Sequence, residues 1–146
     1  MDSAIENVVE QLSAETCWEL LTRAQLGRLA LAVHGEIDIF PVNFIVHEGS
    51  LLFRTAPGTK LFELSVNPRV AFEVDEFDDG VAASVVLKGE AERVEAQDEV
   101  DEADTLGLKP WIPTLKYRWV RITPTSLSGR RFVRAPEPDR YEVIDD

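Results

Sequence analysis

The sequence predicts a mainly β fold, a barrel or sandwich of antiparallel strands accompanied by a few helices. From Arg28 onward, apolar residues recur at every second position in runs separated by glycine-containing turns. Only one clear helical stripe precedes these runs. Short strands joined by tight turns are typical of barrels and sandwiches rather than of parallel sheets. The 146 residues hold no internal repeat, so we expect one domain over 1–146, with a core of about 12–133 and an acidic tail at 135–146.

The first element is a helix that begins at Ser13, a suitable N-cap residue. Glu15 lies in its first turn, where the helix dipole favours an acidic side chain. Apolar residues follow at helical spacing. They are Cys17, Leu20, Leu21 and Ala24. We expect Gly27 to end this helix.

Three strands follow as a meander. The expected strands are 28–34, 37–47 and 51–55, and the expected turns are Gly35-Glu36 and Glu48-Gly49. Pro41 lies within the second strand and has no N–H to donate to a ladder. We therefore expect an edge strand or a bulge at that position.

The second half continues the pattern after one short helix. That helix is expected over 60–66, and Asn67-Pro68 stops it because proline disfavours helical geometry in the preceding residue. The acidic stretch 92–104 is expected to contain a short exposed helix. The remaining strands are expected at 70–75, 81–94 and 117–122, the last of them continuing through 127–133.

Charge and composition exclude several classes of partner. The chain has 15 basic and 27 acidic residues and a net charge of -12, which disfavours nucleic acid and acidic membranes. Cys17 has no partner for an internal disulfide, and with His34 and His47 it leaves little material for a zinc site, so no metal is expected. The amino terminus lacks the features of a signal peptide, and no apolar run could span a bilayer. We expect a soluble, cytoplasmic protein.

The segment 53–61 is a candidate phosphate site. A strand brings Arg54 and Thr55 to a glycine-containing loop, and the loop opens a helix at Thr59 and Lys60. A helix start offers free N–H groups and the favourable end of the dipole, to which these cations and hydroxyls add charge and donors. The alternative is an ordinary strand–loop–helix connection in which Thr59 caps the helix.

Two polar residues interrupt apolar strands. Asn43 lies near Pro41, and together they could present donors and acceptors to the edge of a planar heterocycle. A bulge with a satisfied asparagine is the alternative. Ser84 similarly offers a hydroxyl on an apolar run. We find no activated nucleophile and expect Cys17 to be a core residue, so any catalysis should depend on a cofactor.

Several motifs together resemble the pyridoxamine 5'-phosphate oxidase superfamily, and most closely its flavin-nucleotide-binding and nitroimidazole-resistance-like branch. The segment 53–60, followed by Leu64, Asn67-Pro68 and 70–72, resembles the FMN-phosphate segment of that superfamily. Five further segments fall in the expected order. They are 27–30, 41–44, 84–89, 111–114 and 128–132.

The resemblance implies a six-stranded antiparallel split barrel of Greek-key type, paired as a homodimer with FMN in a groove at the interface. By position, Arg54, Thr55 and Lys60 would hold the phosphate. The isoalloxazine would lie against Pro41, Val42 and Asn43, and its polar edge would contact Ser84 and Val85. The implied function is a flavoprotein oxidoreductase that passes a hydride or electrons to a small organic acceptor.

Two departures from the family pattern narrow this expectation. The branch often has a tryptophan at the position of Ala83, so the ring pocket here is looser or suits a different flavin. The carboxyl-terminal Arg and His residues of true pyridoxamine-phosphate oxidases have no match, so we do not expect vitamin B6 oxidation. Two alternatives remain, a deazaflavin-dependent reductase and a non-catalytic carrier of flavin or haem.

Overall fold

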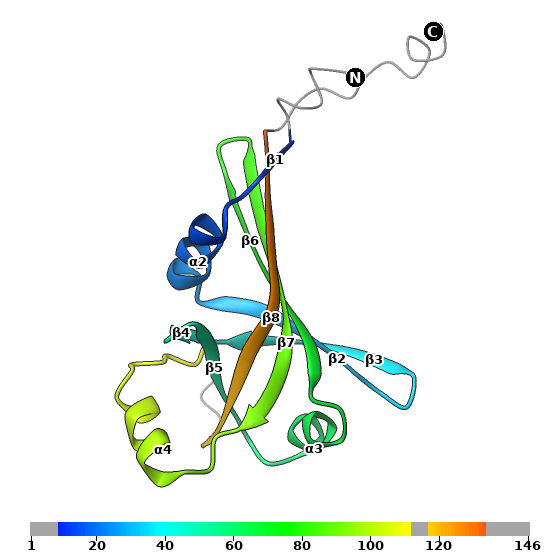
Figure 1. Cartoon of the computed structure of the whole chain (residues 1–146), viewed down its shortest axis with the longest axis vertical. Helices are drawn as coiled ribbons and strands as arrows, with labels where there is room; N and C mark the ends of the chain where they lie inside the picture. Colours follow the sequence, from blue (N-terminus) through cyan, green and yellow to red (C-terminus); the bar gives the residue numbers. More distant parts are fainter. Residues whose placement is uncertain (1–8, 112–116, 134–146) are drawn as a thin grey trace, which may run out of the picture.

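A computed structural model describes residues 9–111 and 117–133 of the chain (Figure 1). The predicted acidic tail at 135–146 and part of the 111–114 motif lie outside these residues. The described helices are α2 (Ala14–Arg23), α3 (Thr59–Val66) and α4 (Gln97–Asp104). The described strands are β1 (Val9–Gln11), β2 (Leu26–Val33), β3 (Glu36–Asn43), β4 (Ile45–His47), β5 (Ser50–Thr55), β6 (Arg69–Asp78), β7 (Val81–Arg93) and β8 (Arg118–Val133).

These strands form one curled antiparallel sheet. Its order is β3-β2-β6-β7-β8-β5-β4, and β1 pairs with the far end of β8. The two strands at opposite ends of this order, β3 and β4, are consecutive in the chain with only Phe44 between them. The sheet must therefore curl until its ends approach each other, which gives the half-barrel seen in Figure 1. This confirms the predicted mainly β split-barrel fold.

The six expected strand regions contain seven of the eight described strands, and the eighth is β1. Phe44 is buried and leaves the ladder, so the strand expected at 37–47 is divided into β3 and β4. The short β1 was not predicted, and its three residues pair with β8 beginning at Val9 opposite Phe132. Pro41 lies in β3, an edge strand that pairs only with β2, and the expectation of an edge at Pro41 is confirmed.

Two local predictions were wrong. The first β-turn is made by His34 and Gly35, which both have left-handed φ values of 52° and 79°, and not by Gly35-Glu36. Gly27 does not end the first helix, because Ala24 is its C-cap and Gly27 already belongs to β2. A Cβ atom at Gly27 would lie 2.2 Å from the ring of Phe72, so glycine allows close packing here.

Two apolar cores lie on opposite faces of the curled sheet. The larger one is enclosed by the sheet and by α2, and its fully buried members include Phe53, Phe72 and Val85. The smaller one lies under α4, where Trp119 packs with Leu52. None of the described helices has the length and apolar character needed to cross a membrane.

Candidate functional site

The predicted phosphate segment has the expected strand–loop–helix form. Strand β5 ends at Thr55, and α3 begins at Thr59 with Gly58 as its N-cap. No side chain caps this helix start, and its first turn holds no acidic residue. The alternative in which Thr59 caps α3 is therefore wrong. The first N–H groups of a helix have no partner within the helix, so this end is a favourable place for an anion.

Arg54 and Thr55 leave β5 on opposite faces of the sheet. In the register of β5 and β8, Arg54 lies opposite Trp119 and Thr55 lies opposite Arg118. Neighbouring residues of a strand point to opposite sides, and directly paired residues share a side. The structure thus separates two side chains that the sequence placed together at one phosphate.

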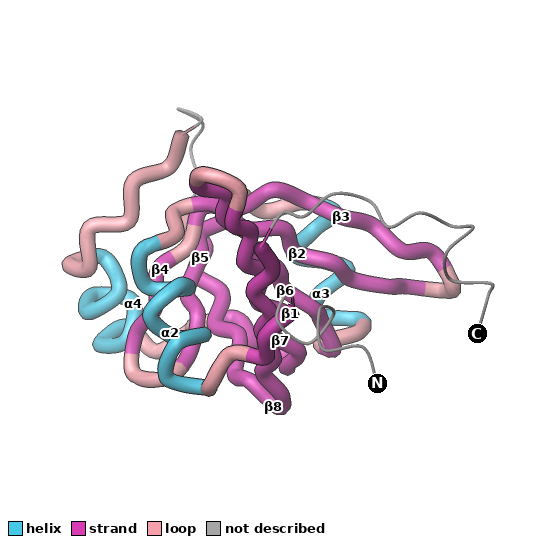
Figure 2. Tube along the Cα trace, turned by 90° about the horizontal axis from the view of Figure 1, so that it is seen from above, coloured by secondary structure: helices cyan, strands magenta, loops and turns pink. Residues whose placement is uncertain are grey.

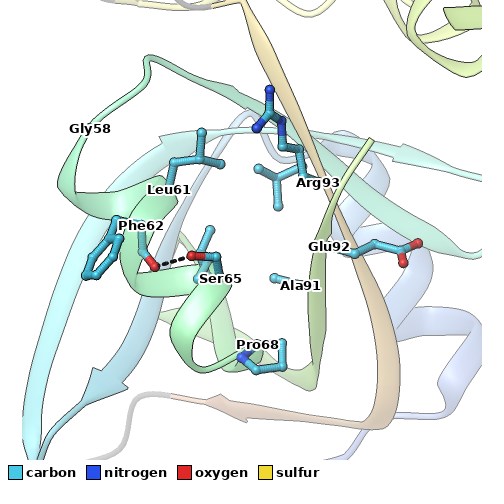
Figure 3. Close-up of a pocket in the computed structure, with 10 residues that line it drawn as sticks. Gly58, Leu61, Phe62, Ser65, Pro68, Ala91, Glu92 and Arg93 are labelled. Carbon is cyan, nitrogen blue, oxygen red and sulfur yellow. Dashed lines mark hydrogen bonds between the residues drawn. The ribbon is translucent and has the colours of Figure 1, made fainter. Parts of the chain in front are cut away.

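The start of α3 lies on the Thr55 side. Gly58 and Leu61 line a cavity of about 440 Å³ together with Val120 of β8. Val120 is two residues from Arg118 and shares its side of the strand. Figure 3 shows this cavity between α3 and the end of β7, with Leu61 and Ser65 pointing into it from the helix. Ser65 donates a hydrogen bond to the Phe62 carbonyl at 2.6 Å.

Arg118 is a candidate that sequence reasoning missed. Its Nε atom is buried and has no hydrogen-bond partner among the described residues, and its guanidinium lies 4.9 Å from the ring centre of Tyr117. A buried guanidinium N–H without a partner is unusual in a folded protein and is typical of a site that receives an anion. The signal was available, because Arg118, Val120 and Ile122 alternate in the sequence and put a cation on an otherwise apolar strand face.

The remaining members of the predicted phosphate set lie at the helix start. Lys60 extends toward β3, where its ammonium nitrogen lies 4.9 Å from the ring centre of Phe40. Thr59 is exposed. Thr55 is buried, and its hydroxyl lies 3.3 Å from the Ala56 carbonyl oxygen. Thr55, Thr59 and Lys60 are thus gathered around the first turn of α3.

Arg54 lies instead beside Asn43. Its guanidinium carbon lies 5.3 Å from the ring centre of Trp119, and one of its terminal nitrogens donates to the Leu108 carbonyl at 3.3 Å. The Nε atom of Arg54 is buried and unpaired. A small cavity of about 10 Å³ separates Arg54 from Asn43 and is closed by Val42, Leu108 and Pro110.

Asn43 bonds the backbone through both its amide nitrogen and its amide oxygen. Its amide group donates to the Gln25 carbonyl at 3.0 Å, and its side-chain oxygen accepts from the N–H of Trp111 at 2.8 Å. The alternative of a satisfied asparagine therefore describes this residue. Of its predicted companions, Pro41 is exposed and Val42 is buried.

Within one chain, Ser84 and Val85 lie far along β7 from the start of α3. Val85 is fully buried in the larger core, whereas Ser84 points to the outer face of the sheet, between Asp75 and Arg130 in the register. Ser84 is nine residues along β7 from Arg93, which pairs with Val120. At about 3.3 Å per residue this is about 30 Å. One chain alone does not bring Ser84 to α3.

Comparison with known proteins identifies close relatives. A family model described as pyridoxamine 5'-phosphate oxidase matches residues 13–131. A Mycobacterium tuberculosis protein without an assigned function is 41% identical over 100 residues, which is 68% of this chain and 91% of its own length. A Corynebacterium glutamicum structure, whose name relates it to pyridoxamine 5'-phosphate oxidase, is 49% identical with a TM-score of 0.82, and the match covers 94% of this chain and 99% of that one.

Two further solved structures share the fold. The FAD binding protein from Mycobacterium smegmatis is 42% identical with a TM-score of 0.75, over 86% of this chain and all of that one. A Bacteroides thetaiotaomicron structure, named for 5-nitroimidazole antibiotic resistance, has a TM-score of 0.74 at 15% identity, over 88% of this chain and 92% of that one. The latter likeness concerns the fold alone.

Proposed function

Because the chain belongs to the pyridoxamine 5'-phosphate oxidase family, we propose that it binds a flavin nucleotide whose phosphate lies at the start of α3. The observation that carries this proposal is the uncapped first turn of that helix, beside Lys60 and Thr55, in a chain with a net charge of -12. A helix start with hydroxyl and ammonium groups around it offers what a phosphate requires.

Arg118 is a second feature that fits a phosphate at the start of α3. Arg118 faces the same side of the sheet as Thr55 and holds a buried Nε atom without a hydrogen-bond partner. A phosphate oxygen would supply the missing acceptor. We therefore add Arg118 to the proposed phosphate group of Thr55, Thr59 and Lys60. The sequence also predicts Arg54 as a phosphate ligand, but Arg54 points to the opposite face of β5, so we leave it out of this group.

FMN is the first candidate cofactor, and FAD is the second. The relative from Mycobacterium smegmatis, at 42% identity, is named as an FAD binding protein. Gly58 and Thr59 are exposed, and no atom lies within 4 Å of the place where a Cβ would stand on Gly58. A phosphate bound there could carry an adenylate outward without a clash.

The proposed groove requires a second copy of the chain. Ser84 lies seven residues along β7 from Ala91, which lines the cavity beside α3. At about 3.3 Å per residue this is about 23 Å, so we infer that a contact of Ser84 with the same flavin would have to come from a partner. The β2–β3 hairpin projects from the rest of the sheet in both views (Figures 1 and 2), and it exposes Ile37 by 73% and Ile39 by 66%. Exposed apolar side chains of this size favour burial against another subunit.

The proposed activity is that of an oxidoreductase. A bound flavin supplies reversible transfer of a hydride or of electrons, here to a small organic acceptor. The chain's own part would be to bind the phosphate and orient the ring. Cys17 is buried, and burial raises the pKa of its thiol, so it offers no reactive thiolate.

Titration of cofactor-free protein tests this proposal. We expect FMN or FAD to bind with a flavin absorbance band, and riboflavin, which lacks the phosphate, to bind more weakly. A deazaflavin would absorb at shorter wavelength, and haem would give a Soret peak. Mixing the dithionite-reduced protein with quinones and nitroaromatics tests turnover. Reoxidation no faster than by oxygen alone would favour a carrier over an enzyme, and binding of neither FMN nor FAD would refute the proposal.

A further inference from the structure

His47, Glu48 and Glu102 form a cluster of metal-ligating side chains that are not among the residues of the proposed flavin site. His47 ends β4, Glu48 begins the turn into β5, and Glu102 comes from α4. One imidazole nitrogen and one carboxylate oxygen from each glutamate all lie within 4.8 Å of one another. Within residues 9–111 and 117–133, no other three His, Cys, Asp or Glu side chains meet in this way.

The imidazole of His47 points an unpaired nitrogen at the two carboxylates. Its Nε2 atom is buried and makes no hydrogen bond to any residue in the described part of the chain. It lies 3.8 Å from a Glu48 oxygen and 3.7 Å from a Glu102 oxygen. Both distances exceed the range of an N–H···O hydrogen bond. Since buried polar atoms are nearly always paired in folded proteins, this nitrogen indicates a missing partner.

The spacing suits a cation between the three groups. Nitrogen and oxygen ligands lie about 2.1 Å from Zn²⁺, so two of them in tetrahedral geometry are about 3.4 Å apart. The two distances from His47, 3.8 and 3.7 Å, are a few tenths of an ångström longer, and all three ligand atoms lie within 4.8 Å of one another. A divalent cation would also balance the two carboxylate charges, and three protein ligands leave a fourth position for water.

We propose that His47, Glu48 and Glu102 bind one divalent transition-metal ion of the Zn²⁺ type. Imidazole favours such ions over Mg²⁺ and Ca²⁺, which prefer oxygen ligands. The few His and Cys residues in the sequence led us to expect no metal. That the fold brings a carboxylate from α4 to the β4–β5 turn cannot be read from the local sequence.

The ion would fasten α4 to the sheet near the proposed flavin site. The segment after α4 reaches Arg54 through the Leu108 carbonyl and Asn43 through the N–H of Trp111. Glu102, in contrast, is largely exposed, and among the residues that the structure describes its side chain contacts the sheet only at His47. Metal binding should therefore stabilise the position of residues 97–111 over the end of β3 and β5.

Calorimetric titration of the full-length, EDTA-treated protein with Zn²⁺ tests the site. We expect one ion per chain, with Mg²⁺ far weaker. His47→Ala and Glu102→Gln should weaken Zn²⁺ binding at least about tenfold, since even the loss of a group that only hydrogen-bonds a metal ligand has an effect of that size. His34→Ala is the matched control, because His34 also lies at a two-residue β-turn and belongs to no such cluster.

The two variants separate loss of metal binding from failure to fold. Glu102→Gln changes an exposed side chain on α4, so it provides a test even if His47→Ala does not fold. Hydrogen exchange should show that Zn²⁺ protects residues 97–111 in the wild-type protein and not in Glu102→Gln. Absence of saturable one-to-one binding, equal affinity for Mg²⁺, or an equal loss in His34→Ala would overturn the proposal.

Discussion

The side chain of Asn43 accepts a hydrogen bond of 2.8 Å from the backbone N–H of Trp111. Together with the bond from Arg54 to the Leu108 carbonyl, it fastens the segment after α4 to the ends of β3 and β5. Two residues predicted to contact the cofactor therefore also hold this segment in place. Loss of either bond should loosen the segment before it affects the rest of the sheet.

Asn43→Ala should accelerate hydrogen exchange in residues 105–111. The substitution leaves the Trp111 N–H and the Gln25 carbonyl without their partner, and we expect a stability loss of about 1 kcal/mol. Asn67→Ala is a matched control, because Asn67 also bonds the backbone on both sides, at Ala32 and Arg69. It should lower stability by a similar amount without affecting 105–111. Equal exchange in the two variants would contradict this assignment.

The structure divides the predicted cofactor residues into three places. The glycine-containing loop and the helix after it were predictable because proline, glycine and spacing act locally. Which way Arg54 points depends on the register of β5 against β8, and nothing in the local sequence determines that register. Ser84 shows the same limit, since its distance from α3 depends on the length and pairing of β7.

The fold was more predictable than the site for a related reason. Alternation and turn residues identified nearly every strand, because they reflect burial on one face of a sheet. The split at Phe44 was not visible, since a buried phenylalanine continues the apolar pattern while it leaves the ladder. Gly27 was misassigned because the requirement for glycine there comes from the ring of Phe72, which is distant in sequence.

Arg118→Ala should weaken FMN binding selectively. Loss of a charge-assisted hydrogen bond to phosphate corresponds to about 1.5–3 kcal/mol, whereas riboflavin has no phosphate to lose. Arg54→Ala is the comparison, because Arg54 points to the other face of β5 and should affect FMN and riboflavin equally. Titration of both variants with both ligands decides the point. If Arg54→Ala alone weakened FMN binding more than riboflavin binding, Arg54 and not Arg118 would be the phosphate ligand.

The chain should be a dimer in solution. Light scattering should give twice the chain mass of 16.4 kDa at micromolar concentration. Ile39→Glu places a charge on the exposed face of β3 and should shift the protein toward monomer with loss of bound flavin, while Ile39→Val should leave both unchanged. A wild-type monomer that still binds flavin would refute the shared groove and leave Ser84 without a role in it.

The ion pair between Arg23 and Glu76 should contribute stability only above acidic pH. Arg23 donates hydrogen bonds of 2.8 and 3.0 Å, which hold the pKa of Glu76 below its ordinary value. A lowered carboxyl pKa stabilises the fold above the unfolded value of about 4.3, and this contribution is lost as pH falls through the lowered value. Both side chains are about half exposed, so a double-mutant cycle with Arg23→Gln and Glu76→Gln should give at most about 1 kcal/mol at pH 7. A coupling energy that persists at pH 2 would contradict this cause.

We expect Cys17 to be a structural core residue with an unreactive thiol. The side chain is 1% exposed, and burial raises the pKa of its thiol, so the reactive thiolate is disfavoured in the native state. A Cβ at Gly129 would lie 2.6 Å from its sulfur, so the packing around it is tight. Cys17→Ser should lower the free energy of unfolding by about 1–3 kcal/mol, because the smaller, more polar hydroxyl is buried at a site that offers it no hydrogen-bond partner among the described residues. Flavin content and any turnover should be unchanged.

A thiol-specific reagent should react with wild-type protein only at the rate of unfolding. Rapid labelling of the folded protein, or loss of flavin from a folded Cys17→Ser variant, would instead indicate that the thiol belongs to the flavin site.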